Sequence, residues 1–434
     1  MLRRPEYRRA LVFCGLVGIP VSLAAFWFLV LLHELEHLLW VDWPHHLGWS
    51  DPPWWWPLPQ ALVSGLLVTL VVTRLPGRGG HIPAAGLHPG GASKAALPGV
   101  MIAALASLPL GAVLGPEAPM IALGSGLMLL LRDLVRAPAT EAGTALLGAA
   151  GSAAAISAIF GSPLVAAVLL MEVAGAGGTQ LFAVMLPALL ASGVGAIVFT
   201  GFGHWTGLQT GSLDIGLPAP PILDTGDVVW SLLMAVAVGA AIHYVIVGGR
   251  VVAGLVAAHP WRNTVLCALA AAGCAALYAV LTDRSPSEVS LSGQSTLSQL
   301  AADPHAWPVG SLVAVLVFKA LAYSLCLGSL RGGPVFPSLF LGGALGVLLA
   351  PLPGLGVVPG MAAGMAASSA AALRLPVSCV VLVVIIVGHP GSVPVIVLAA
   401  VVAFVTTELL PQGPGIPAFT AGRRRKPRPV TPRP

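Results

Sequence analysis

The stretch GPEAPMIALGSGL, at residues 115–127, returns in altered form as GPVFPSLFLGGAL at residues 333–345. The two stretches share Gly, Pro, Pro, Leu, Gly and Leu at identical offsets. Each opens with a Gly-Pro pair, and proline is tolerated in the first turn of a helix because the N–H that it lacks has no partner there. Both stretches therefore predict a helix that begins abruptly within apolar sequence, and their similarity predicts an internal duplication.

The composition places the chain in a membrane. Of its 434 residues, 57% are hydrophobic and only 9% are charged, which is too apolar for a soluble domain with a charged surface. Several apolar runs approach the roughly 20 residues that a spanning helix needs. Glycine (52 residues) and proline (39) are frequent, and inside lipid such breaks need protein or a water-filled cavity to satisfy the freed backbone groups. The sequence predicts an all-α polytopic membrane protein with broken and re-entrant helices.

A second pair of matches supports the duplication. Gly151-x-Ala-Ala leads to Pro163, and Gly364-x-Ala-Ala leads to Pro376 with the same separation. A polar stretch rich in proline and glycine cuts the chain near its middle. We predict a first membrane repeat at 1–202, a linker at 203–226, a second repeat at 227–421 and a basic tail at 422–434.

The net charge of +5 comes largely from basic residues near the two ends, such as Arg3, Arg4 and residues 423–426. This pattern does not indicate a nucleic-acid partner. Under the positive-inside rule it predicts that both termini are cytoplasmic in a multi-pass protein of the cell membrane. If each repeat crosses the bilayer an odd number of times, the second is inverted relative to the first. Inverted repeats place a binding site near the bilayer midplane.

The beginnings of the two repeated helices are the predicted site. A helix N-terminus carries unpaired N–H groups and the positive end of the helix dipole, so it attracts anions. Two such ends, at 115–119 and 333–337, form an anion site that needs no buried lysine or arginine. Glu117 lies in the first, and a carboxylate within a membrane is costly enough to mark a functional site. We expect Glu117 to act as a gate; the alternative is that it only caps its own helix.

Four stretches resemble motifs of the CLC family of chloride channels and transporters. Gly79-Gly80-His81-Ile82-Pro83 is similar to the family's G-S-G-I-P, and Gly115-Pro116-Glu117-Ala118-Pro119 to its G-x-E-G-P. Gly332-Gly333-Pro334-Val335-Phe336-Pro337 resembles G-G-I-F-A-P, and Phe160-Gly161-Ser162-Pro163-Leu164 resembles F-N-A-P-L. The resemblance implies a CLC-type inverted repeat, a homodimer in the lipid bilayer and one pathway per subunit for chloride or a related small anion. It implies a transport protein rather than an enzyme.

The resemblance places the anion-binding positions at Gly80, His81, Glu117, Ala118, Val335, Phe336 and Phe419. Two side-chain donors of the family are missing, because its serine is Gly80 here and its C-terminal tyrosine is Phe419. The anion would then rely on backbone N–H groups, which leaves the choice between chloride and fluoride open. His81 either donates to the anion, senses pH, or is a structural histidine.

The resemblance also bears on proton coupling. Proton-coupled members of the family carry a second, inward-facing glutamate after the F-N-A-P-L helix, and that position is Val173 here, preceded by Glu172. A valine cannot relay protons, so we favour a channel with passive permeation. Glu172 is the proton-relay candidate, and because of it a proton-coupled chloride or fluoride antiporter remains the alternative function. Lys319, in an apolar run, is expected to raise the local potential or to pair with Glu172.

His33-Glu34-x-x-His37 has the spacing by which zinc proteases place two histidines on one helix face. This makes an intramembrane zinc metalloprotease an alternative of another class. Such a site needs a third ligand and an open coordination position, and no aspartate lies in the short Asp-Gly type motif that membrane metalloproteases carry. Six tryptophans follow the histidines, which favours a membrane edge. We therefore predict no metal site and no cofactor.

Overall fold

The computed structural model describes residues 5–87, 93–136, 140–175, 178–208, 210, 215–217 and 223–416, without the side chains of 141, 142 and 178–182. Within these ranges the chain is helical, and its one β-type pairing is an isolated bridge. Eight of the described helices are long and apolar enough to cross a membrane. The protein is therefore a multi-pass membrane protein, as the composition predicts.

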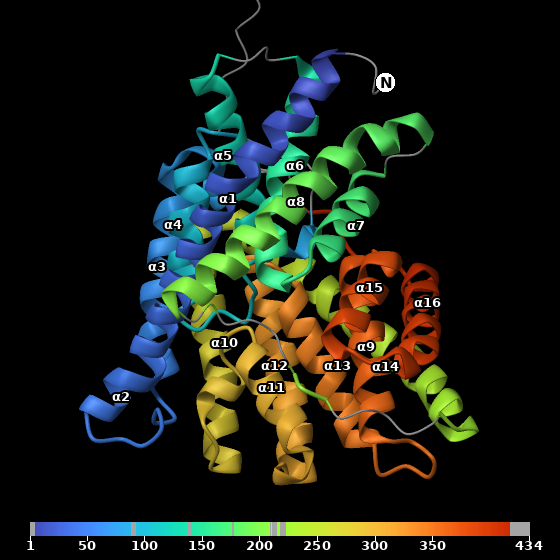
Figure 1. Cartoon of the computed structure of the whole chain (residues 1–434). Helices are drawn as coiled ribbons and strands as arrows, with labels where there is room; N and C mark the ends of the chain where they lie inside the picture. The colour runs from blue at the N-terminus through green and yellow to red at the C-terminus, as the bar shows by residue number, and fades with distance from the viewer. Residues whose placement is uncertain are drawn as a thin grey trace, which may run out of the picture.

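The helices follow one another in two similar series (Figure 1). The first series is α1 (Pro5–His37), α2 (Trp43–His46), α3 (Pro57–Arg74), α4 (Leu97–Ser107), α5 (Glu117–Leu134), α6 (Glu141–Phe160), α7 (Pro163–Ala174) and α8 (Gly178–Thr206). The second is α9 (Thr225–Ala258), α10 (Pro260–Thr282), α11 (Gln294–Ala302), α12 (Val309–Ser329), α13 (Val335–Leu349), α14 (Val357–Leu373), α15 (Pro376–Val387) and α16 (Val393–Leu409). The exact repeat and linker boundaries stay a prediction.

The same packing pattern occurs in both halves. In the first, α5 packs on α6, which packs on α8 and α1; in the second, α13 packs on α14, which packs on α16 and α9. Figure 1 shows α5 to α8 gathered above α11 to α16. The short helices α4, α7, α13, α14 and α15 are apolar but under 18 residues, so they are the broken elements that the glycine and proline content predicts.

Glycine pairs allow the closest of these contacts. A Cβ atom on Gly124 would overlap the carbonyl of Gly151, and one on Gly342 would overlap the carbonyl of Gly364. Helices approach this closely only where side chains are absent, as in other membrane helix pairs. These four glycines are among those that recur in the two copies of the sequence, so this part of the repeated pattern has a packing cause.

The loops before α5 and α13 meet at an antiparallel bridge between Gly115 and Gly333. The N–H of Gly115 donates to the carbonyl of Gly333 at 2.8 Å, and the N–H of Gly333 donates to the carbonyl of Gly115 at 2.6 Å. The two glycines hold equivalent positions in the repeated stretches. A reciprocal pair between equivalent residues places a local two-fold axis between them. The second half is thus inverted relative to the first, and α5 and α13 begin beside this axis.

The segment after α1 turns the chain back toward α3. A π-helix, Leu38–Asp42, extends α1, and the indole N–H of Trp40 donates to the carbonyl of Pro109 at 2.9 Å. Trp43 and Trp54, in contrast, are about half exposed, at 49% and 52%. Exposed tryptophans of this kind suit the interface between lipid and water.

Candidate functional site

Glu117 is the first residue of α5, and its side chain is buried at 1% exposure. Its Oε1 accepts a hydrogen bond of 3.0 Å from the backbone N–H of Phe336, in the first turn of α13. Its Oε2 is buried and has no hydrogen-bond partner. A helix N-terminus stabilises negative charge through its dipole and free N–H groups. The carboxylate therefore lies at the helix end where the sequence predicts an anion.

The bridging glycines leave the space that this carboxylate fills. A Cβ atom on Gly115 or on Gly333 would collide with the carboxyl group of Glu117. The loop before α13 is held by the hydroxyl of Tyr323, which donates to the carbonyl of Pro334 at 2.7 Å. Glu117 is thus enclosed by the beginnings of both repeated helices.

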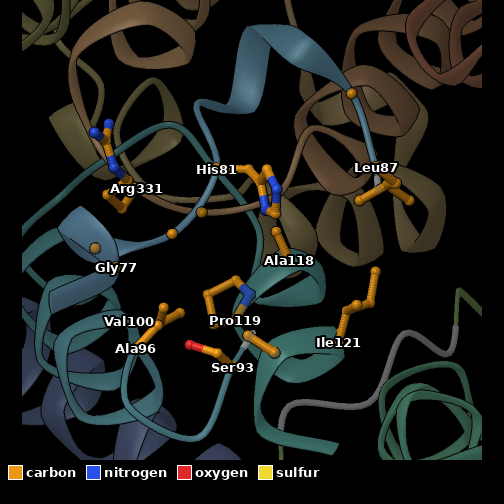
Figure 2. A pocket seen from close by; sticks show the side chains of 15 residues that line it. Gly77, His81, Leu87, Ser93, Ala96, Val100, Ala118, Pro119, Ile121 and Arg331 are labelled. Carbon is orange, nitrogen blue, oxygen red and sulfur yellow. The ribbon is translucent and has the colours of Figure 1, made fainter. Parts of the chain in front are cut away.

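The first cavity, of about 230 Å³, brings three of the four motifs together. Its lining includes Gly79, Gly80 and His81 from the first motif, and Ala118 and Pro119 from the second. It also includes Gly332, which begins the third motif, and Arg331, the residue before that motif. Figure 2 shows His81 beside Ala118, with Arg331 at another edge of the cavity. Segments far apart in the sequence therefore form one space.

The second cavity, of about 400 Å³, is lined in part by Leu114 and Pro116, by α1, and by polar side chains of α11. Pro116 lines this cavity, whereas Ala118 lines the first. Glu117 lies between these two residues in the sequence and contacts α13 across the bridge. Glu117 itself belongs to neither lining, but its two chain neighbours line different cavities.

The predicted anion-binding residues fall into three groups. Gly80, His81 and Ala118 line the first cavity. Val335 and Phe336 are buried in the first turn of α13, where Phe336 N–H already bonds Glu117. Phe419 lies outside the described residues. Gly80 has a φ of 91°, a conformation that side chains rarely adopt, so a serine at this position would be strained here.

Glu172, the proton-relay candidate, caps a helix. Its carboxylate accepts from the backbone N–H of Val377 at 3.1 Å, and from the N–H and hydroxyl of Ser378 at 2.7 and 2.6 Å. These donors lie in the first turn of α15, where a carboxylate satisfies groups that the helix leaves unpaired.

The predicted pairing of Lys319 with Glu172 is wrong. The Nζ of Lys319 donates to the carbonyls of residues 288–291 at 3.0 to 3.3 Å, and its side chain is fully buried. Because an ammonium group has three N–H donors, a cluster of carbonyls can satisfy it without a carboxylate. Lys319 therefore orders the loop before α11.

The histidines of the protease-like motif line the second cavity. His33, Glu36 and His37 contribute to its wall, and the Nδ1 of His37 lies 3.1 Å from Oδ2 of Asp42. Within the described part of the chain, no three His, Cys, Asp or Glu side chains form a group that could hold a metal ion. Asp224, in the predicted linker, and Asp227, at the start of the second repeat, have a structural role, since they form a capping box at the start of α9. Among the described residues, the zinc protease alternative therefore lacks a third ligand.

Arg331 is the site residue that the sequence did not reveal. It is only 4% exposed and lines the first cavity. A single arginine before Gly332 belongs to no recognised pattern. The sequence does contain one signal: Arg331 lies between the apolar run of α12 and the third motif, where a buried charge has a high free-energy cost.

Comparison with known proteins finds relatives of nearly the whole chain. A family model described as "Voltage gated chloride channel" matches residues 61–408. A protein of Escherichia coli (strain SMS-3-5 / SECEC) named "Putative ion-transport protein YfeO" is 27% identical over 411 residues, covering 91% of this chain and 88% of the relative. The protein of the same name from Escherichia fergusonii matches with the same identity and coverage.

Two solved structures share the fold. The crystal structure of a slow cyanobacterial Cl-/H+ antiporter superposes with a TM-score of 0.73 at 19% identity, covering 92% of this chain and 94% of that one. A CLC-type fluoride/proton antiporter superposes with a TM-score of 0.65 at 21% identity, covering 91% and 95%. The family model spans most of the chain and the fold is shared over nearly its whole length, so the protein belongs to the CLC family of voltage gated chloride channels and related transporters.

Proposed function

We propose that this protein is a passive pathway for chloride or a related small anion, and that the carboxylate of Glu117 is its gate. The observation that carries the proposal is the hydrogen bond from Phe336 N–H to Glu117, whose chain neighbours Pro116 and Ala118 line different cavities. We propose further that the protein is a homodimer in the cell membrane with both termini in the cytoplasm. Family membership favours transport over enzymatic activity.

The gate works by competition for the same backbone donors. When ionised, Glu117 places its own negative charge at the beginning of α13, which excludes a mobile anion from that place. Protonation removes the charge and weakens the hydrogen bond from Phe336, because bonds to an ionised acceptor are stronger than bonds to a neutral one. The carboxyl group can then leave, and an anion can take the N–H groups. Flux through the wild-type protein is therefore expected to rise as the pH falls.

Passive permeation is favoured by the surroundings of Glu172. A proton relay needs a carboxyl group that can gain and lose its proton during transport, and three donors of α15 hold Glu172 as an acceptor. Its neighbour Val173 offers no proton site. The second candidate function is proton-coupled antiport, because the two solved structures that share the fold are described as a Cl-/H+ antiporter and a CLC-type fluoride/proton antiporter.

A reversal potential separates the two functions. In liposomes with a chloride gradient and a pH gradient, the current through the purified protein should reverse at the potential set by chloride alone. Coupling would move the reversal potential whenever the pH gradient changes, because each cycle would then carry protons. A shift that follows the proton gradient would establish the antiporter and overturn passive permeation. The same recording with fluoride in place of chloride compares the two anions.

The variant Glu172→Gln tests the structural role of this residue. Loss of a capping interaction is expected to cost about 1 kcal/mol of stability, so the melting temperature should fall by a few degrees. The chloride flux and its reversal potential should stay at the wild-type values, since Glu172 moves no proton. A changed reversal potential in this variant would instead assign proton transfer to Glu172.

A further inference from the structure

Among the residues that the structure describes, Arg331 is a buried cation without a counter-charge. It follows α12, is 4% exposed, and its Nη1 donates to the carbonyl of Leu330 at 3.0 Å. Its Nε is buried and has no hydrogen-bond partner. None of the ion pairs found in the described ranges includes Arg331. Because a charge inside a membrane protein is expected to have a partner, this guanidinium requires a negative ion from elsewhere.

The surroundings of Arg331 place that charge at the first cavity. Its backbone N–H donates to the hydroxyl of Ser107 at 3.2 Å, which holds the residue against the end of α4. A Cβ atom on Gly79 would lie 3.4 Å from Cγ and 3.5 Å from Nε of Arg331, so the first motif packs directly on this side chain. Figure 2 shows Arg331 beside the loop that carries Gly77.

The cavity itself has no acid to neutralise the arginine. Its described lining consists of glycines, apolar residues, Ser93, His81 and Arg331, and includes no aspartate or glutamate. The hydroxyl that the CLC motif would supply is absent at Gly80, and the N–H of Phe336 already bonds Glu117. The permanent charge in the lining is therefore that of Arg331, since arginine stays protonated in proteins.

We propose that Arg331 makes the first cavity a binding site for a small inorganic anion. This inference rests on the proposed function and adds a residue that concentrates the anion next to the gate. The attraction acts at short range in a medium of low dielectric constant, where a unit charge has a much larger effect than in water. The site holds its anion while the carboxylate of Glu117 occupies the beginning of α13, so anion binding does not require flux.

The test compares two buried arginines by calorimetric titration of the purified protein with sodium chloride. Arg331→Met removes the cavity charge and keeps most of the side-chain volume. Arg132→Met is the matched control, because Arg132 is 7% exposed but already pairs with Asp133 at 2.6 Å and lies outside the cavity lining. Arg331→Met should weaken chloride binding by at least about tenfold, given the low dielectric constant. Arg331→Lys, which keeps the charge, should restore most of the affinity.

The melting temperature and the liposome flux of each variant complete the experiment. Equal chloride affinity in Arg331→Met, Arg132→Met and the wild type would overturn the inference, even if Arg331→Met melts at a lower temperature. If the wild type conducts chloride while this equality holds, the proposed pathway stands and only the role of Arg331 fails. If the wild type neither binds nor conducts chloride, and the same titration and efflux with sodium fluoride also give no signal, both proposals fail together.

Discussion

Anion flux through the Glu117→Gln variant should exceed that of the wild type by on the order of tenfold at neutral pH, equivalent to about 1.4 kcal/mol. Glutamine keeps the shape of the side chain but removes its charge, so the beginning of α13 no longer holds a fixed negative group. The same change should remove the rise of flux at low pH, because the titrating group is gone. Both effects are measurable as chloride efflux from liposomes at several pH values.

A second acid near the pathway provides the control for this variant. Glu34 lies on α1 between residues that line the second cavity, but it is exposed and contributes nothing to that lining. Glu34→Gln should therefore keep both the wild-type flux and its pH dependence. If Glu117→Gln abolishes flux altogether while the protein remains folded, Glu117 is not a gate. The charge of the carboxylate would then be required for permeation itself.

The variant Gly342→Ala should lose about 1–3 kcal/mol of stability, the usual cost of overpacking. The new methyl group would overlap the carbonyl of Gly364 on α14, so α13 must move away from its partner. Because α13 carries the N–H group that holds Glu117, the displacement should also disturb the gate. Thermal unfolding in detergent measures the first effect, and efflux from liposomes measures the second.

The equivalent glycine in the first repeat and an unrelated glycine complete the comparison. Gly124→Ala should destabilise the protein by a similar amount, because it overlaps the carbonyl of Gly151 in the same way. Gly273, in α10, has no atom within 4 Å of its Cβ position, so Gly273→Ala should gain up to about 1 kcal/mol from helix propensity. Equal stability of Gly342→Ala and Gly273→Ala would show that α13 and α14 are not in close contact.

Much of the fold could be predicted because its causes are local. The length of the apolar runs and the Gly-Pro starts of α5 and α13 act within single helices, and the recurring Gly124 and Gly151 mark where two neighbouring helices touch. Each leaves a pattern that survives in the sequence alone. Inversion followed from the charge at the termini and from the duplication, and the bridge between Gly115 and Gly333 now supplies its geometric basis.

The parts that could not be predicted depend on which distant segments meet. Lys319 lies in an apolar run, and only the folded loop at residues 288–291 shows that carbonyls satisfy it. Glu172 stands next to a position that matters in the family, yet its partners are on α15, half a chain away. Arg331 looks like a flanking residue until Gly79 and Ser107 are brought against it. Spacing along the sequence carries no information on such encounters.

The axis between Gly115 and Gly333 bears on how a chain of this kind could have arisen. Two separate half-length ancestors could form the same bridge with each other, one pointing up and the other down. Each would then bring its own glutamate, and two like charges would compete for one small space. Fusion of the halves lets the copies diverge, and here the counterpart of Glu117 is Val335. A single acid can then serve both halves, which a strictly symmetric pair could not achieve.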